Sequence, residues 1–144
     1  MKFFRKLWRD ASGVTAVEFS LLGPVMITAM LGVLQIGTAM WSYNSMRSVA
    51  HDAARFAVVN YQTGNRLTES QVADYVRSVA TNSPYGLDNN NLTITVAAAG
   101  TQRVTGATEL TMTISYAVPT VLSLIGLNDI PMSYSRPVFL TNAS

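Results

Sequence analysis

The sequence predicts an α+β protein in which a long N-terminal membrane helix continues into a small extracytoplasmic domain. Residues 19–40 contain no ionisable side chain. A later segment shows helical spacing of apolar residues, and three further segments alternate apolar with polar residues. Charged residues make up only 12% of the 144 residues, against about 25% in soluble domains, so part of the chain is expected to lie in lipid or in a packed assembly.

The basic residues gather at the N-terminus, where Lys2, Arg5, Lys6 and Arg9 all precede residue 10. From Val14 onward the remaining arginines are outnumbered by carboxylates, so the pI of about 9.2 reflects the leader alone. We therefore expect no direct binding of nucleic acid. The absence of cysteine excludes disulfides, thiolate metal sites and a cysteine nucleophile.

Residues 19–40 are long enough to cross a membrane. As a helix they measure about 33 Å, and a bilayer's hydrocarbon core is about 30 Å thick. Trp41 and Tyr43 follow, where aromatic side chains favour the interface. The basic leader predicts a single pass through the cytoplasmic membrane with the N-terminus inside. A cleaved secretory signal has a shorter apolar region of about 7–15 residues, whereas a signal anchor explains both length and orientation.

Two residues of this segment have competing interpretations. Glu18 stands at the membrane's edge, where an unpaired carboxylate is costly and marks a functional candidate. It could equally be an interfacial acid that suits the dipole at a helix N-terminus. Pro24 is expected to kink the helix, although a proline without a role is also tolerated in membranes.

The run from Gly13 to Phe19 resembles the processing site of type IV pilin-like precursors. In those precursors a short basic leader ends in glycine, and a membrane-embedded peptidase cuts after it. The resemblance implies a leader of residues 1–13 and cleavage between Gly13 and Val14. Glu18 becomes the fifth residue and Phe19 the sixth. It further implies that Glu18 pairs with the new α-amine of Val14 on a neighbouring subunit during assembly.

More narrowly, the chain resembles the TadE-like family of minor pseudopilins of tight-adherence (Tad or Flp) pili. The residues that carry this resemblance are Gly13, Ala16, Val17, Glu18, Phe19, Pro24 and the run from Ala53 to Val58. It is loose beyond residue 60, Thr15 departs from the usual small apolar residue, and TadE-like and TadF-like subunits are not separated. The implied partners are the prepilin peptidase, other pilin and pseudopilin subunits, an inner-membrane assembly platform and the lipid bilayer.

Residues 14–41 are thus the predicted membrane and assembly helix, and residues 42–144 the exported domain. The first helix is expected to continue to about residue 60, with an apolar stripe at Met46, Val49, Ala53 and Phe56. Asp52 and Arg55 have the i, i+3 spacing of a helix ion pair.

A second helix is predicted over about 69–80, because Thr68 and Gln71 form a capping-box pattern. Strands are predicted at about 92–98, 108–118 and 132–140, with the first two as a hairpin. Pro137 favours an edge position for the third strand. The apolar segment 120–127 is too short to span a bilayer, and is expected to cover the sheet as a short helix or loop, or to bind a partner.

The scattered carboxylates, the single histidine, His51, and the lack of catalytic motifs favour a structural role over an enzyme, with no cofactor and no metal. His51 is expected at the surface, and the loop around Asp88 lacks the spacing of a calcium site. Two alternatives remain. One is an uncleaved, signal-anchored scaffold of a secretion or pilus machine that binds partner proteins through its exported domain. The other is a membrane-anchored enzyme or ligand-binding domain, which requires a concave polar pocket.

Overall fold

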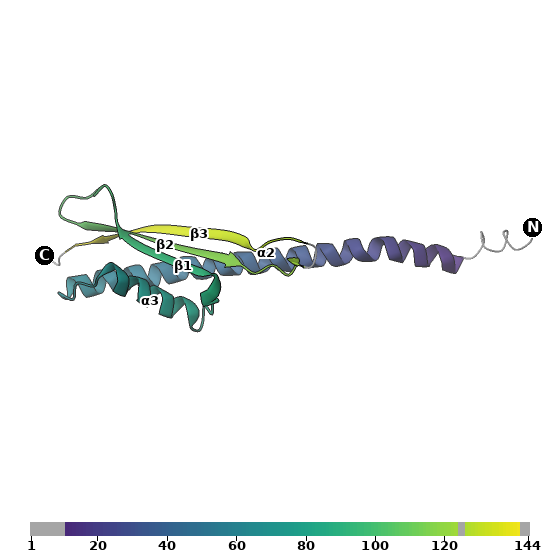
Figure 1. Cartoon of the computed structure of the whole chain (residues 1–144), viewed down its shortest axis with the longest axis horizontal. Helices are drawn as coiled ribbons and strands as arrows, with labels where there is room; N and C mark the ends of the chain where they lie inside the picture. Colours follow the sequence, from purple (N-terminus) through teal and green to yellow (C-terminus); the bar gives the residue numbers. More distant parts are fainter. Residues whose placement is uncertain (1–10, 124–125, 142–144) are drawn as a thin grey trace, which may run out of the picture. The chain divides into compact units, whose positions relative to one another are not determined.

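The computed structural model describes residues 11–123 and 126–141. It contains helices α2 (Ala11–Gln62) and α3 (Glu69–Thr81), the 3₁₀ helix η1 (Asn89–Asn91), and strands β1 (Leu92–Ala98), β2 (Thr108–Val118) and β3 (Ile130–Leu140) (Figure 1). The chain divides into a unit that ends at Gly37 and a second unit, Thr38–Ser144. The predicted α+β class, with a long apolar helix, a second helix and a three-stranded antiparallel sheet, is confirmed.

Helix α3 begins where local sequence chemistry dictates. The Thr68 hydroxyl accepts a hydrogen bond from the Gln71 backbone N–H at 3.3 Å, and the Thr68 N–H donates to the Gln71 side chain at 2.8 Å. This capping box satisfies two donors that a helix start otherwise leaves unpaired. Val72, Val76 and Ala80 then form the buried face of α3.

The sheet has the order β1-β2-β3, with both neighbouring pairs antiparallel. Ile114 lies between Ile94 of β1 and Tyr134 of β3, so these side chains share one face. The opposite face carries small hydroxyl side chains, and Thr113 and Ser135 are hydrogen-bonded across two strands at 3.1 Å. Strand β3 is an edge strand, as Pro137 predicted.

Strand β3 begins two residues earlier than the predicted 132–140. The two additional residues are Ile130 and Pro131, and proline has no N–H to donate to a ladder. At an edge strand alternate residues direct their backbone groups away from the sheet, so a proline there costs no ladder bond. Pro131 and Pro137 are six residues apart, so the backbone nitrogens of both prolines face the same side of the strand.

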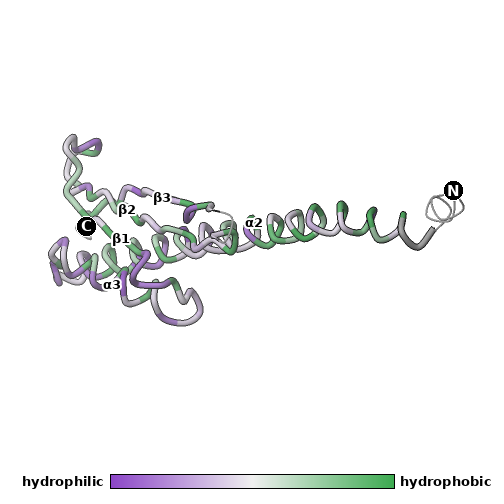
Figure 2. The backbone as a smooth tube through the Cα atoms, turned by 45° about the vertical axis from the view of Figure 1, so that its right-hand side comes forward, coloured by the Kyte–Doolittle hydropathy of each residue, from purple (hydrophilic) through white to green (hydrophobic). Residues whose placement is uncertain are grey.

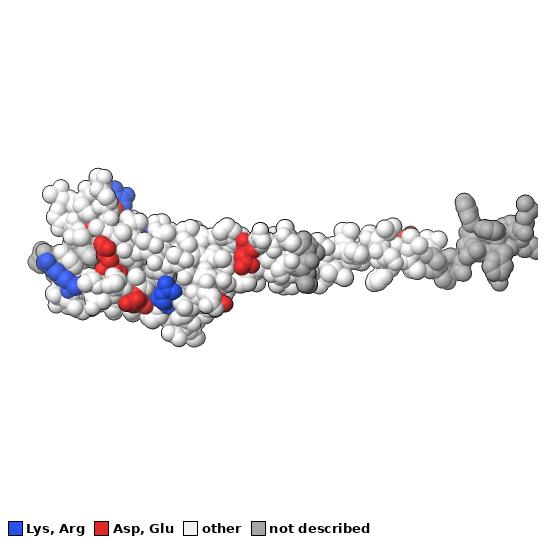
Figure 3. All heavy atoms as spheres, viewed as in Figure 1, with Lys and Arg blue, Asp and Glu red and all other residues white. Residues whose placement is uncertain are grey.

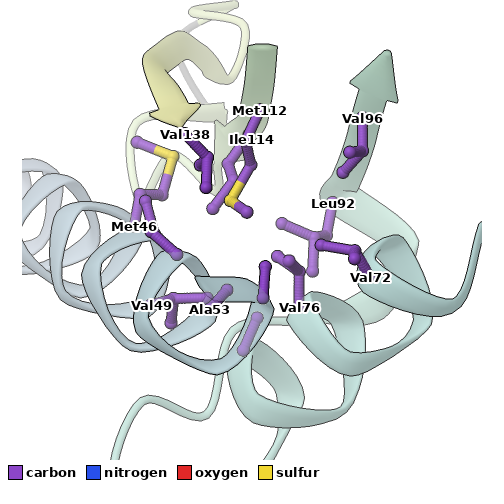
Figure 4. Packing of buried hydrophobic residues seen from close by; sticks show 14 of the residues in the cluster. Met46, Val49, Ala53, Val72, Val76, Leu92, Val96, Met112, Ile114 and Val138 are labelled. Atoms are coloured by element: carbon purple, nitrogen blue, oxygen red, sulfur yellow. The ribbon is translucent and has the colours of Figure 1, made fainter. Parts of the chain in front are cut away.

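The second unit folds around one hydrophobic core. The α2 segment from Thr38 onward and helix α3 cover one face of the sheet, and side chains from both helices meet those of the strands (Figures 1 and 4). The predicted stripe on α2 is buried at Met46, Val49 and Ala53. Phe56, the fourth member, is half-buried and stacks on Tyr75 of α3 with ring centroids 3.7 Å apart.

The β1–β2 connection is held by a buried carboxylate that the sequence did not predict. Glu109 at the start of β2 is only 2% exposed. Its oxygens accept hydrogen bonds from the backbone N–H of Arg103 at 3.2 Å and from the Arg103 side chain, with which it forms a salt bridge. The Arg103 guanidinium also lies 5.4 Å from the centre of the Phe139 ring. The connection is therefore fastened to both β2 and β3.

This pair predicts a loss of stability in acid. Hydrogen bonding from Arg103 lowers the pKa of Glu109 below its ordinary value of 4.5, so the charged carboxylate stabilises the fold. Because the folded pKa is the lower one, the contribution is fully present above about pH 4.5 and is lost as the pH falls through the lowered pKa. We expect wild type to be more stable than Glu109→Gln at neutral pH, and the difference to shrink in acid. Unfolding followed by circular dichroism against pH measures it; a pH-independent difference would contradict the assignment.

Candidate functional site

The part of α2 from Val14 to Leu34 is predominantly apolar, and its side chains are exposed or half-buried. Phe19 is 77% exposed, and Val14, Leu21, Met26 and Val33 are all more than half exposed. Figure 2 shows this part of the helix as predominantly hydrophobic, and Figure 3 shows it almost free of charged atoms on the face in view. Within the described residues, α2 is the one helix long and apolar enough to cross a membrane. A helix segment that is predominantly apolar and largely exposed is suited to lipid or to packing among other helices.

Glu18 is the single charged residue of α2 before Arg47. Its side chain is exposed, and its carboxylate has no hydrogen-bond or salt-bridge partner among the residues that the structure describes. Val14 precedes it by four residues, so the two lie on the same side of the helix, one turn apart. Phe19, next to Glu18, is the most exposed of the large apolar residues. The carboxylate is therefore available to a group from outside this chain.

The predicted cleavage site and the predicted kink both lie in α2. Gly13 falls within the helix, whereas residues 1–10 of the predicted leader lie outside the described residues. Pro24 also lies inside α2, which continues past it to Gln62. Its carbonyl oxygen accepts a hydrogen bond from the Thr28 hydroxyl at 2.8 Å. The roles of Gly13, Val14, Glu18, Phe19 and Pro24 remain predictions.

The second unit carries an open groove of about 540 Å³ between α2 and β3. Its apolar lining includes Val58, Pro137 and Phe139, and its polar lining comes from His51, Asp52, Arg55 and Arg136. The Arg136 guanidinium contacts the Nδ1 atom of His51. His51 is exposed, as predicted. No sequence pattern predicts that β3 brings an arginine to it, because the two residues are 85 positions apart.

The predicted ion pair between Asp52 and Arg55 is wrong. In the described part of the chain, Asp52 instead accepts a hydrogen bond of 2.9 Å from the Tyr85 hydroxyl, and no salt bridge joins it to Arg55. The loop after α3 delivers this hydroxyl, so a tertiary contact replaces the local one. The hydrogen bond raises the pKa of Tyr85 above its ordinary value of 10.0. Arg55 and Arg136 are left to face the groove, which suits an acidic side chain of a partner.

No three histidine or carboxylate side chains of the described residues converge at a point where they could hold a metal ion. The groove also pairs no nucleophile with a base: His51 contacts a guanidinium, and Asp52 accepts its bond from a tyrosine. Its geometry is that of a shallow binding surface.

Comparison with known proteins identifies one family. The family model described as TadE-like protein matches residues 13–55, which is less than half of the chain. No curated protein and no solved structure matches the chain. The match contains Gly13, Val14, Glu18, Phe19 and Pro24, and it ends at Arg55 in the groove. The resemblance to TadE-like proteins is thereby confirmed, and it indicates a pilin-like protein associated with tight-adherence pili that interacts with other pilus components.

Proposed function

We propose, starting from this TadE-like segment, that the chain is a minor pilin-like (pseudopilin) subunit for the biogenesis of a tight-adherence pilus. It crosses the cytoplasmic membrane once with its N-terminus inside, and a prepilin peptidase cuts it after Gly13. The mature helix then packs among other pilin and pseudopilin subunits at the inner-membrane assembly platform. The role is structural and involves no catalysis.

The observation that carries this proposal is an uncharged, exposed apolar helix segment led by one unpartnered carboxylate, Glu18. A helix that served only as an anchor does not need a carboxylate at the membrane's edge, and a charge that becomes buried when helices pack is costly unless it is paired. Assembly supplies the partner. Cleavage after Gly13 creates an α-amine at Val14 with an ordinary pKa of about 7.7–8.0, which is mostly cationic at neutral pH.

The geometry favours pairing between subunits. The amine of Val14 would lie one helical turn from Glu18 of its own chain, but the side chains around Glu18 are exposed and leave room for an adjoining helix. In a bundle, the amine of one subunit and the carboxylate of the next neutralise each other in an apolar setting. Such a pair would fix the axial register between helices, while the aliphatic side chains supply cohesion.

The groove favours a second candidate function, an uncleaved anchored scaffold. Arg55 and Arg136 beside an apolar lining would bind an acidic residue of a partner protein. This role requires neither the cut nor a paired Glu18.

Photo-crosslinking at Phe19 tests the proposed function. Benzoylphenylalanine in place of Phe19 keeps an aromatic ring at an exposed position, and we expect ultraviolet light to join it to other pilin subunits in membranes that contain the whole assembly system. The matched control carries the same residue at the exposed Asn90 of the second unit and should give no such adduct. An absence of adducts from Phe19 would contradict the assembly role.

A further inference from the structure

The β2–β3 connection, Pro119–Asp129, exposes apolar side chains on a closed loop. Val121 is 47% exposed and Leu127 is 50% exposed, and Ile130 at the start of β3 is 37% exposed. The loop is closed at its base, where the Asp129 carboxylate accepts a hydrogen bond of 3.0 Å from the N–H of Thr120. Within it, the N–H of Leu127 donates to the carbonyl of Leu122 at 3.4 Å. In the described part of segment 120–127, Val121 and Leu122 lie in a turn, Ser123 has 3₁₀ conformation and Leu127 has no regular structure.

This loop lies at the end of the second unit where the chain arrives from residue 37. The Tyr43 ring packs edge-on against Tyr134, with centroids 6.1 Å apart. Further along both elements, His51 contacts Arg136. Strand β3 therefore runs in the same direction as α2, and the loop that precedes β3 is on the side of Thr38. Met40 and Trp41, 62% and 51% exposed, belong to that same end of the unit.

The two ends of the unit carry different side chains. The opposite end carries the polar turn after α2, which includes Arg66, and the β1–β2 connection with its Arg103–Glu109 pair. No lysine or arginine occurs between Arg103 and Arg136, and the one acid of the β2–β3 connection, Asp129, is engaged with Thr120. Exposed apolar and aromatic side chains thus collect at the end tethered to the apolar helix.

We propose that Val121, Leu122, Leu127 and Ile130, together with Trp41, enter the headgroup–acyl boundary of the bilayer and seat the domain on the membrane surface. This inference rests on the proposed function, because the membrane helix is what brings this end of the domain to lipid. Apolar side chains gain free energy at that boundary, and tryptophan favours it. Because none of these five side chains is charged, we expect the contact to depend on apolar burial and not on anionic lipid or on salt.

The chain contains no cysteine, so single cysteines can carry an environment-sensitive fluorophore in the full-length protein. Val121→Cys is the test position. Val104→Cys at the opposite end is the matched control, because Val121 is 47% exposed and Val104 is 46% exposed. The protein is reconstituted in phosphatidylcholine vesicles with nitroxide-labelled lipids. We expect a blue shift and about twofold or greater quenching at Val121, since side chains at this boundary reach about 5–10 Å into the bilayer, and neither change at Val104.

Additional measurements show whether the fluorescence change at Val121 comes from apolar insertion, from electrostatic binding or from a second copy of the chain. Quenching at Val121 should persist with added salt and without anionic lipid; strong dependence on either would overturn apolar insertion. A shift at Val121 that vanishes when the protein is diluted in lipid would assign the surface to a second copy and overturn the proposal. A label at Leu34→Cys separates the two hypotheses. Quenching there but not at Val121 refutes the loop contact alone, whereas no quenching at Leu34 refutes the membrane helix and the loop contact together.

Discussion

Replacing Glu18 with alanine is expected to remove this chain from assembled pili while leaving its membrane insertion intact. The variant keeps the uncharged segment that directs insertion and deletes the carboxylate that neutralises a neighbour's amine. Losing one member of a buried ion pair costs about 3–5 kcal/mol, which corresponds to a decrease of roughly two to four orders of magnitude in the binding constant. The measurement is the amount of this chain in sheared pili relative to the amount in the membrane.

Ser20→Ala is the matched control for this variant. Ser20 is also exposed and polar, but its hydroxyl donates to the carbonyl of Ala16 in its own helix at 2.7 Å. Its removal should leave pilus incorporation unchanged. Normal incorporation of Glu18→Ala would show that the carboxylate is an interfacial acid without a role in assembly.

Replacing Gly13 with valine is expected to abolish processing. The resemblance places the cut after this glycine, and a β-branched side chain crowds the backbone that a peptidase has to reach. The variant should keep residues 1–13, so that no free amine forms at Val14 and Glu18 loses its partner. Intact mass separates the two forms. Ser12→Ala, one residue away, should be cut like wild type, and a Gly13→Val protein that still starts at Val14 would place recognition elsewhere.

The elements of the fold were predictable where local chemistry decides them. Thr68 and Gln71 mark the start of α3, and the alternation of apolar residues with threonine and serine marks β1 and β2. Strand β3 begins two residues before its predicted start and includes Pro131, which an edge strand tolerates and a central strand does not. That property belongs to the sheet order and is not present in the segment itself.

The contacts that shape the domain surface could not be predicted, since they join residues far apart in sequence. Arg136 contacts His51 because β3 packs along α2. The Tyr85 hydroxyl donates a hydrogen bond to Asp52 because the loop after α3 folds back toward α2. The candidate assembly site is the opposite case. Gly13, Val14 and Glu18 lie within six positions of one helix, so their spacing alone fixes their relation.

The mature N-terminus tests the central claim most directly. Intact mass of the protein from pili, or from membranes of cells with an active prepilin peptidase, should give a chain that begins at Val14, and peptidase-deficient cells should yield the uncut form. A protein that still carries residues 1–13 in peptidase-positive cells with functional pili would contradict the account, because Glu18 would then have no neighbouring amine to neutralise.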